Sequence, residues 1–350
     1  MIKALVVEDS RVVRDFLVHI LSSDPDIRVI GTVANGEEAL EAVKREKPDV
    51  ITMDIHMPKM GGLEATRRIM ETTPVPIVIV SGSGEPKEVA TTFRAMEAGA
   101  LAVLPRPTGM GHPDHQAMAK ELVQTVKLMS EVKVVRRWAR PQRDTAAAGA
   151  VREPVLPQGV PAEIRLIAIG ASTGGPLVLQ TILSRLPKDC SVPVLIVQHM
   201  VADFIPGFVE WLGQTCSLPI HVATHGEYCL PGHAYMAPGG YQMKVEMGRK
   251  LVLTRDEPEN GHRPSVSALF RSVAQVFGRH AVGVLLTGMG TDGAEELKVM
   301  KDQGAMTIAQ DKDSSVVHGM PGEAIKLDGA SYVLPPDKIA SALTGLVKTT

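Results

Sequence analysis

The chain has 350 residues, with 37 lysines and arginines against 39 aspartates and glutamates, and aromatic residues make up 3% of it. This length suits two domains of roughly 150 residues, each large enough to bury a core. The balanced charge and the scarcity of aromatic side chains argue against a dedicated nucleic-acid binder, which needs a basic surface or a stacking platform.

The composition is that of a folded protein, and we expect it to work in the cytoplasm. Hydrophobic residues make up 44% and charged residues 22%, close to the average for globular domains. Charged side chains interrupt residues 1–20, so no signal peptide is expected, and no apolar run reaches the roughly 18 residues of a membrane span. Cys190, Cys216 and Cys229 lack the spacing of a zinc site, so we expect reduced thiols.

The first 130 residues alternate short apolar runs with longer amphipathic ones, a pattern that predicts a parallel α/β fold. The expected strands are Ile2–Val7, Ile27–Ala34, Val50–Met53, Ile77–Val80 and Ala100–Leu104. Helical periodicity covers Val12–Leu21 and Glu37–Arg45, and Ser10 and Asn35 stand where helix N-caps belong. We therefore expect a domain of five βα units in residues 1–130.

From residue 131 to 162 the pattern gives way to a stretch rich in Pro, Ala and Arg, which is typical of a linker. A second α/β pattern follows in residues 163–350. Its expected strands include Ile164–Ile169, Val194–Val197, Val282–Leu286 and Met306–Ala309. Two more runs, Tyr241–Met247 and Leu251–Thr254, flank a turn that contains glycine. We therefore expect a mainly parallel sheet with an antiparallel hairpin at its edge.

Polar residues gather at the predicted carboxyl ends of the strands in the first domain, where parallel sheets hold functional groups. Glu8 and Asp9 follow the first strand and Asp54 the third, while Ser81 and Arg106 follow the fourth and fifth. Each residue alone would more often be an ordinary loop residue, so the prediction depends on the set. Three converging carboxylates repel one another unless a cation lies between them, and an all-oxygen set suits Mg²⁺. A carboxylate beside Mg²⁺ can accept a phosphoryl group.

Taken in order, the segments VVEDS, TMDIHMP, VSG and LPRP resemble the receiver domain of two-component response regulators, over residues 1 to about 128. The resemblance implies a doubly wound (βα)5 fold, phosphorylation of Asp54 by a histidine kinase, and a switch hydroxyl on Ser81. It also implies a Mg²⁺ site formed by Glu8, Asp9, Asp54 and the backbone carbonyl of His56.

Two positions depart from the usual receiver pattern. Arg106 stands where receivers usually have Lys, and Val103 stands where many have an aromatic switch residue. Arginine keeps the positive charge but differs from lysine in reach and geometry. We therefore expect phosphate sensing at this site without the usual aromatic rotamer switch.

In the second domain, the strand that ends at Ile169 leads into GASTGGP, which places Ser172 at a strand-to-helix turn. Residues 170–174 satisfy G-x-S-x-G, the pattern of a nucleophile elbow. Gly-rich turns of this kind more often bind phosphate through backbone N–H groups, although the Walker and dinucleotide-binding spacings are absent. On this loop alone, a nucleophile and a phosphate cradle stay equally open.

Two further strand ends favour the nucleophile. The strand Val194–Val197 leads to His199, and the strand Val282–Leu286 leads to Asp292. A single histidine is more often structural and Asp292 alone would more often cap a helix, but with Ser172 they supply a nucleophile, a base and an orienting carboxylate. Their order in the chain differs from the Ser-acid-His order of α/β-hydrolases, which argues against an ordinary lipase-like esterase.

The segments IGASTGGP, VQHM, AYMAPG, HRPSV, LTGMGTDGA and HGMP resemble, in order, the catalytic domain of the chemotaxis protein-glutamate methylesterases. The resemblance implies hydrolysis of glutamate methyl esters and deamidation of glutamines in chemoreceptors, with no metal in this domain. The implied roles are nucleophile for Ser172, general base for His199, orienting residue for Asp292, and oxyanion donors for Thr173 and the backbone N–H of Met289.

Ser267 stands where this family commonly has Asp. Since it lies outside the triad, we expect the change to affect a local loop or an interdomain contact rather than the chemistry.

The same resemblance implies regulation by the receiver. We expect the unphosphorylated receiver to cover the catalytic cleft, and phosphorylation of Asp54 to shift the population toward an open form. The expected partners are a histidine kinase and methyl-accepting chemoreceptors, without nucleic acid or membrane insertion, and the expected form is a monomer.

Two other functions compete with this one. A response regulator whose second domain only binds a ligand would be favoured by the loss of a triad residue, but all of them are present. A DNA-binding response regulator is disfavoured because the output segment is too long for a simple helix-turn-helix module and has no basic recognition helix.

Overall fold

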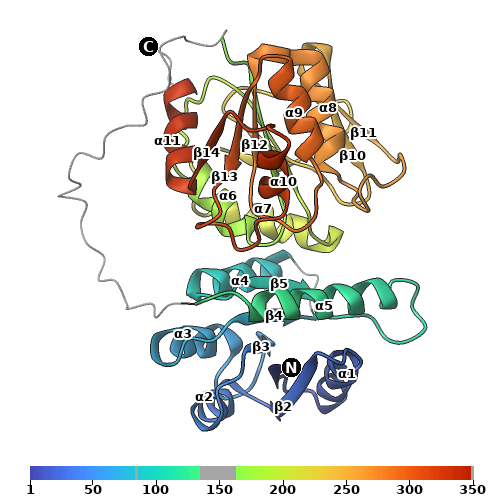
Figure 1. Ribbon diagram of the computed structural model, residues 1–350, viewed down its shortest axis with the longest axis vertical. Coiled ribbons are helices and arrows are strands. Elements are labelled where there is room, and N and C mark those ends of the chain that lie inside the picture. The colour runs from blue at the N-terminus through green and yellow to red at the C-terminus, as the bar shows by residue number, and fades with distance from the viewer. Residues whose placement is uncertain (83–85, 135–162, 348–350) are drawn as a thin grey trace, which may run out of the picture. The chain divides into compact units, whose positions relative to one another are not determined.

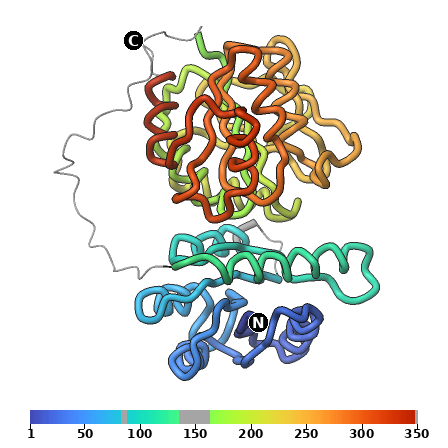
Figure 2. The backbone as a smooth tube through the Cα atoms, in the orientation of Figure 1, coloured from blue at the N-terminus to red at the C-terminus, as the bar shows by residue number. Residues whose placement is uncertain are grey.

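The computed structural model describes residues 1–82, 86–134 and 163–347 of the chain. The chain divides into two compact units, Met1–Ala148 and Gly149–Thr350, and Figure 2 traces the backbone of each in sequence colours. Most of the predicted linker, from residue 135 to 162, lies outside the described residues.

The first unit contains five parallel strands in the order β2-β1-β3-β4-β5 (Figure 1). The strands are β1 (Ile2–Val7), β2 (Ile27–Val33), β3 (Val50–Met53), β4 (Ile77–Ser81) and β5 (Ala102–Pro105). All five predicted strands are confirmed to within two residues at each end. The strand order is that of flavodoxin-like folds, which hold their ligands at the carboxyl ends of the strands.

Five helices connect and follow these strands: α1 (Arg11–Ser22), α2 (Gly36–Arg45), α3 (Gly62–Thr72), α4 (Pro86–Ala98) and α5 (His115–Ser130). Asn35 caps α2 as predicted, since its side chain accepts a hydrogen bond from the N–H of Glu38. Ser10 holds the N-cap position of α1, but its side chain makes no capping hydrogen bond.

The second unit contains seven parallel strands in the order β14-β13-β12-β6-β7-β9-β8. They are β6 (Leu166–Ala171), β7 (Val194–Gln198), β8 (Ile220–Val222), β9 (Ala234–Met236), β12 (Ala281–Leu285), β13 (Met306–Gln310) and β14 (Tyr332–Leu334). The helices are α6 (Gly175–Leu183), α7 (Ile205–Gly213), α8 (Val266–Phe277), α9 (Ala294–Asp302), α10 (Met320–Lys326) and α11 (Pro336–Val347). Short 3₁₀ turns lie at Ala202–Phe204, Met247–Arg249 and Gly278–His280.

The strand β6 lies in the middle of this sheet, and the direction of winding reverses beside it. The chain passes from β6 to β7 and the strands beyond, and then returns to β12 on the other side of β6. In the sheet, Gly170 pairs with Leu285, and Ala171 pairs with Gln198. The loops after β6, β7 and β12 therefore leave the sheet at the same edge, next to the switch point where open α/β sheets bind their ligands.

The predicted hairpin is confirmed, but it is not an edge of the main sheet. The strands β10 (Gln242–Glu246) and β11 (Lys250–Thr254) form a two-stranded antiparallel sheet of their own. Met243 and Val245 are buried in the same core cluster as α8, and the N–H of Val245 donates to Ser272 Oγ on that helix at 3.1 Å. The hairpin therefore buries its apolar face against a helix instead of pairing with a strand edge.

Phe270 offers a direct test of this core. Its side chain is 0% exposed in the cluster that joins α8 to the sheet, so Phe270→Ala should lower the free energy of unfolding of the second unit by about 3–5 kcal/mol. Urea unfolding of the full chain measures the loss. Val299→Ala, at a 40% exposed position on α9, should change it by less than about 0.5 kcal/mol. Equal losses in the two variants would contradict the packing described.

Candidate functional sites

Ser172 lies directly after β6, in the sharp turn that leads into α6. Its N–H donates to the carbonyl of Thr287 at 3.0 Å, and the N–H of Gly175 donates to the carbonyl of Ser172 at 2.8 Å. Gly174 has a φ of 80°, a conformation that glycine adopts without strain. The turn therefore fixes the serine at the carboxyl end of the central strand.

His199 and Asp292 form a buried pair at the ends of the two strands beside β6. Nε2 of His199 lies 2.8 Å from Oδ2 of Asp292, and their side chains are 7% and 1% exposed. Because Nε2–H is donated to the carboxylate, the lone pair of the neutral ring is on Nδ1. This Nδ1 is buried and has no hydrogen-bond partner among the described residues, so it is the atom available to take a proton.

The structure thus brings Ser172, His199 and Asp292 to three neighbouring strand ends of one sheet. The N–H of His199 donates to the carbonyl of Ala171, the residue before the serine, at 2.9 Å. This hydrogen bond joins the ends of β6 and β7. Within the described part of the chain no hydrogen bond joins Ser172 Oγ to the imidazole. Asp292 does not cap α9, whose N-cap residue is Gly293.

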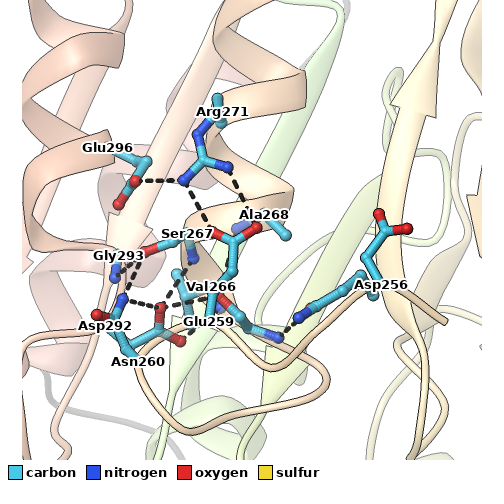
Figure 3. Close-up of polar contacts among 12 residues, drawn as sticks. Asp256, Glu259, Asn260, Val266, Ser267, Ala268, Arg271, Asp292, Gly293 and Glu296 are labelled. Carbon is cyan, nitrogen blue, oxygen red and sulfur yellow. Dashed lines mark hydrogen bonds and ion pairs between the residues drawn. The ribbon is translucent and has the colours of Figure 1, made fainter. Parts of the chain in front are cut away.

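The carboxylate of Asp292 is surrounded by donors (Figure 3). In addition to His199, it accepts from Val266 N at 2.7 Å, Ser265 Oγ at 2.9 Å, Asn260 Nδ2 at 3.1 Å and Ser267 N at 3.1 Å. Burial by itself would raise the pKa of this carboxyl, but the hydrogen bond and charge of His199, followed by the donors at the start of α8, hold the pKa well below its usual range. Asp292 is therefore an anion in direct contact with the imidazole of His199.

Ser267 lies against this carboxylate, closer to the chemistry than we expected. It is 1% exposed, its N–H donates to Asp292, and its Oγ accepts from Gly293 N at 3.0 Å and from Asn260 Nδ2 at 3.2 Å. A hydroxyl at this position adds no second negative charge beside Asp292. Ser267 therefore contacts Asp292 directly, whereas we expected this position to affect a local loop or an interdomain contact.

Two residues of the site, Asn260 and His262, were missed in the sequence. The ring of His262 stacks on that of His199, with centroids 3.7 Å apart and planes 8° apart. Burial and then the charge of His199 lower the pKa of His262 to about 4, so this ring is neutral near pH 7. The Asn260-Gly261 dipeptide is a signal for a tight turn, and it marks the segment that carries both side chains.

Two backbone N–H groups lie free beside the serine. Those of Thr173 and Met289 have no hydrogen-bond partner among the described residues. Thr173 follows Ser172 directly, and Met289 follows Gly288, where an added Cβ would lie 2.7 Å from Cβ of Ser172. The backbone N–H groups of Thr173 and Met289 are therefore unpaired among the described residues and lie close to Ser172.

In the first unit, Glu8, Asp9 and Asp54 converge as predicted. One carboxylate oxygen of each lies within 4.8 Å of the others, and Glu8 and Asp54 are buried. Arg106 Nη2 lies 2.9 Å from Glu8 Oε2 and 3.8 Å from Asp54 Oδ2. The arginine that replaces the usual lysine therefore reaches the acidic cluster.

The electrostatics of this cluster suit a divalent cation. Burial, followed by the charge of Asp54, raises the pKa of Glu8 to about 7, and burial raises the pKa of Asp54. Crowded and desolvated carboxylates of this kind are stabilised by added positive charge, and an all-oxygen donor set fits Mg²⁺. The carbonyl of His56, the fourth predicted ligand, accepts no hydrogen bond from another described residue.

Ser81, the predicted switch hydroxyl, and Val103, which stands in place of an aromatic switch residue, lie at the end of β4 and on β5. Ser81 ends β4, and its carbonyl accepts from the N–H of Arg106 at 2.7 Å. Val103 lies on β5, partly buried against the core of the first unit. An aliphatic side chain at this position has no ring to exchange between rotamers.

The comparisons with known proteins match both units. The family described as CheB methylesterase matches residues 167–343, and the response regulator receiver domain matches residues 4–112. The chain is similar over its whole length to proteins named protein-glutamate methylesterase/protein-glutamine glutaminase. The one from Nitrosospira multiformis is 62% identical over 99% of this chain and 97% of that protein, and one from Geobacter metallireducens is 60% identical over 99% of both.

A solved structure supports the fold of the second unit. The CheB methylesterase catalytic domain of Thermotoga maritima is 35% identical and matches with a TM-score of 0.51, covering 53% of this chain and 100% of that domain. A receiver and a parallel α/β output domain in one chain define a response regulator with an enzymatic output. The chain belongs to the CheB methylesterase family. Among the described residues, no helix is both long and apolar enough to cross a lipid bilayer.

The lowered pKa of His262 predicts a pH dependence of stability. Between its ordinary pKa of about 6.5 and its folded value of about 4, the unfolded chain binds more protons than the folded one, so stability falls as the pH drops through this window. His262→Phe keeps a ring for stacking but cannot titrate, and should make the fall shallower. Urea midpoints of the second unit, measured across the window, test this, and an unchanged slope in the variant would contradict it.

Proposed function

We propose that the second unit removes methyl esters from glutamate side chains of chemoreceptors through an acyl-enzyme on Ser172. The observation that carries this proposal is the buried pair of His199 and Asp292, joined at 2.8 Å, beside a serine held at the end of the central strand. In its neutral form an imidazole with an unpartnered Nδ1 can act as a base, and its carboxylate partner stabilises the cation that forms on proton transfer.

The reaction proceeds in two halves. Nδ1 of His199 takes the hydroxyl proton as Ser172 Oγ attacks the ester carbonyl, and the protonated ring then gives this proton to the methoxy group, which leaves as methanol. In the second half, His199 deprotonates a water molecule that attacks the acyl-serine, and the ring returns the proton to Ser172. Glutamate is released, and the enzyme is restored.

The free N–H groups of Thr173 and Met289 are placed to stabilise the oxyanion that forms in both halves. A preorganised donor of this kind is typically worth about 3 kcal/mol of transition-state stabilisation. Deamidation of glutamine passes through a similar tetrahedral oxyanion, with ammonia in place of methanol as the leaving group. We therefore propose that the same groups perform both activities that stand in the names of the relatives.

We propose that the first unit regulates this reaction. Mg²⁺ held by Glu8, Asp9, Asp54 and the carbonyl of His56 would neutralise the charge that accumulates when Asp54 is phosphorylated. Ser81 and Arg106 are positioned to bind oxygens of the phosphoryl group, Arg106 as a fork rather than as a point charge. Phosphorylation then shifts the population toward a form with an open catalytic cleft.

The partners in this scheme are a histidine kinase as phosphodonor and methyl-accepting chemoreceptors as substrates. We propose that the protein meets both in the cytoplasm, and that it works as a monomer because each unit supplies its own set of functional side chains.

The role of Ser172 can be tested with radiomethylated receptor membranes. Ser172→Ala should lower the rate of methanol release by a factor on the order of 10³ or more, since the variant lacks the hydroxyl on which the acyl-enzyme forms. Ser184→Ala, at an exposed serine just beyond α6, is the matched control and should keep the wild-type rate. Equal release by Ser172→Ala and the wild type would exclude Ser172 as the nucleophile.

The regulatory role can be tested with a small-molecule phosphodonor and Mg²⁺. The donor should raise methanol release by the wild type, while Asp54→Asn should not respond and Asp15→Asn, at an exposed position on α1, should respond normally. Removal of Mg²⁺ with a chelator should abolish the response and leave the basal rate intact, because the hydrolase site requires no metal. A full response in Asp54→Asn would contradict the proposal.

A further inference from the structure

The segment before α8 contains a tight turn that places an amide against the triad. Glu259 and His262 exchange backbone hydrogen bonds of 3.1 and 2.8 Å, and the two residues between them, Asn260 and Gly261, have φ values of 52° and 81°. This is the backbone of a turn that Asn-Gly favours. Asn260 extends from it to Oδ1 of Asp292 (Figure 3).

The contacts of Asn260 fix which way its amide points. Nδ2 lies 3.1 Å from Asp292 Oδ1 and 3.2 Å from Ser267 Oγ, and both are acceptors for its two hydrogens. The hydroxyl of Ser267 is itself held, because it accepts from Gly293 N at 3.0 Å. The amide is therefore a donor to the carboxylate of Asp292.

An ion-pair cluster holds this turn in place. Arg271, on α8, binds both carboxylate oxygens of Glu259 at 3.2 and 2.8 Å and also Glu296 of α9 at 2.8 Å. A fork bound at two points restricts Glu259 more than a single exposed pair does. Since Glu259 is adjacent to Asn260, Arg271 ties the turn to the helices on which Asp292 depends.

We propose that Asn260 is a positioning residue for the pair of Asp292 and His199, and that Arg271 sets the position of Asn260 through Glu259. The proposal deepens the hydrolase function proposed above and rests on it. The amide shares Oδ1 with Ser265 Oγ and Ser267 N, while Oδ2 faces Nε2 of His199 and the N–H of Val266. The amide thus helps to hold the carboxylate in the orientation that leaves Nδ1 of the ring unpartnered among the described residues.

Several charged and titratable groups determine how the pair responds to pH. His199 faces Asp292 from the end of β7, and the neutral ring of His262 stacks on His199. The start of α8 faces the carboxylate with backbone N–H groups and a hydroxyl. Arg271, Glu259 and Glu296 form the ion-pair cluster beside the turn. A hydrogen bond to the carboxylate spreads its negative charge. Loss of the amide therefore strengthens the pull of Asp292 on a proton, and the pair becomes protonated at higher pH.

Two substitutions of Asn260 keep the turn and change only the amide, because glycine and aspartate also adopt this conformation. Asn260→Gly removes the donor, and Asn260→Asp puts a carboxylate beside Asp292. Arg271→Gln breaks the fork, and Arg271→Lys keeps the charge but not the two-point contact. Lys244→Gln breaks the ion pair of Lys244 with Asp256, near the other end of the same segment, and is the matched control.

The full-length protein is assayed for methanol release from radiomethylated receptors across a range of pH. We expect Asn260→Gly to lower kcat roughly tenfold with KM unchanged, as for the loss of one charged hydrogen bond, and to move the acid limb of the profile to higher pH. Asn260→Asp should lower kcat further. Arg271→Gln should lose roughly threefold with the same direction of pH shift, Arg271→Lys should fall between it and the wild type, and Lys244→Gln should match the wild type.

Three results would overturn the proposal. One is a wild-type rate and pH profile in Asn260→Gly. Another is an effect on KM alone, which would make Asn260 a substrate contact, and the third is a loss in Lys244→Gln as large as that in Arg271→Gln.

A second readout separates this proposal from the proposed function. A fluorophosphonate probe phosphonylates an activated serine without any receptor, because the serine oxygen attacks phosphorus and fluoride leaves, and Ser172→Ala provides the blank. Slower labelling of Asn260→Gly and Arg271→Gln than of the wild type would support the positioning role even if the wild type released no methanol. Labelling at the wild-type rate in both variants would overturn it even if methanol release confirmed the function.

Discussion

A carboxylate that must stay charged while fully buried is the constraint around which the catalytic unit is built. Asp292 is 1% exposed, and an unpaired anion at that depth would be too costly to persist. The chain meets this need with donors from elements far apart in sequence: the ring of His199, the start of α8 and the amide of Asn260. The contacts that stabilise the buried charge also fix the orientation of the carboxylate relative to the imidazole.

The first unit also buries carboxylates, but the protein neutralises their charge only in part. Its carboxylates are crowded at the ends of β1 and β3, and Arg106 satisfies only part of their charge. Burial and repulsion leave Glu8 with a raised pKa of about 7, whereas Asp292 is stabilised fully by the protein itself. In the second unit the carboxylate of Asp292 is held by hydrogen-bond donors of the protein, and in the first unit the acidic cluster offers an all-oxygen donor set that suits a divalent cation.

Local patterns predicted most of the framework, because buried parallel strands read as unbroken aliphatic runs. The strands β8, β9 and β14 were missed since each has three residues and no period to detect. The strand ends located Ser172, His199 and Asp292, but the stacking of His262 and the contacts of Ser267 depend on how α8 approaches the sheet. No local signal carries that approach, although the Asn260-Gly261 turn was visible in the sequence.

The position of β6 at the middle of its sheet also explains an oddity of the triad. Ser172, His199 and Asp292 follow β6, β7 and β12, three adjacent strands, so their order in the sequence reflects only the side of β6 on which the chain first adds strands and the side to which it returns. A circular permutation opened before α8 would give the order Asp, Ser, His and keep every strand in its place. The order of such residues in a sequence therefore reports how the strands are connected. It does not report which reaction the residues perform.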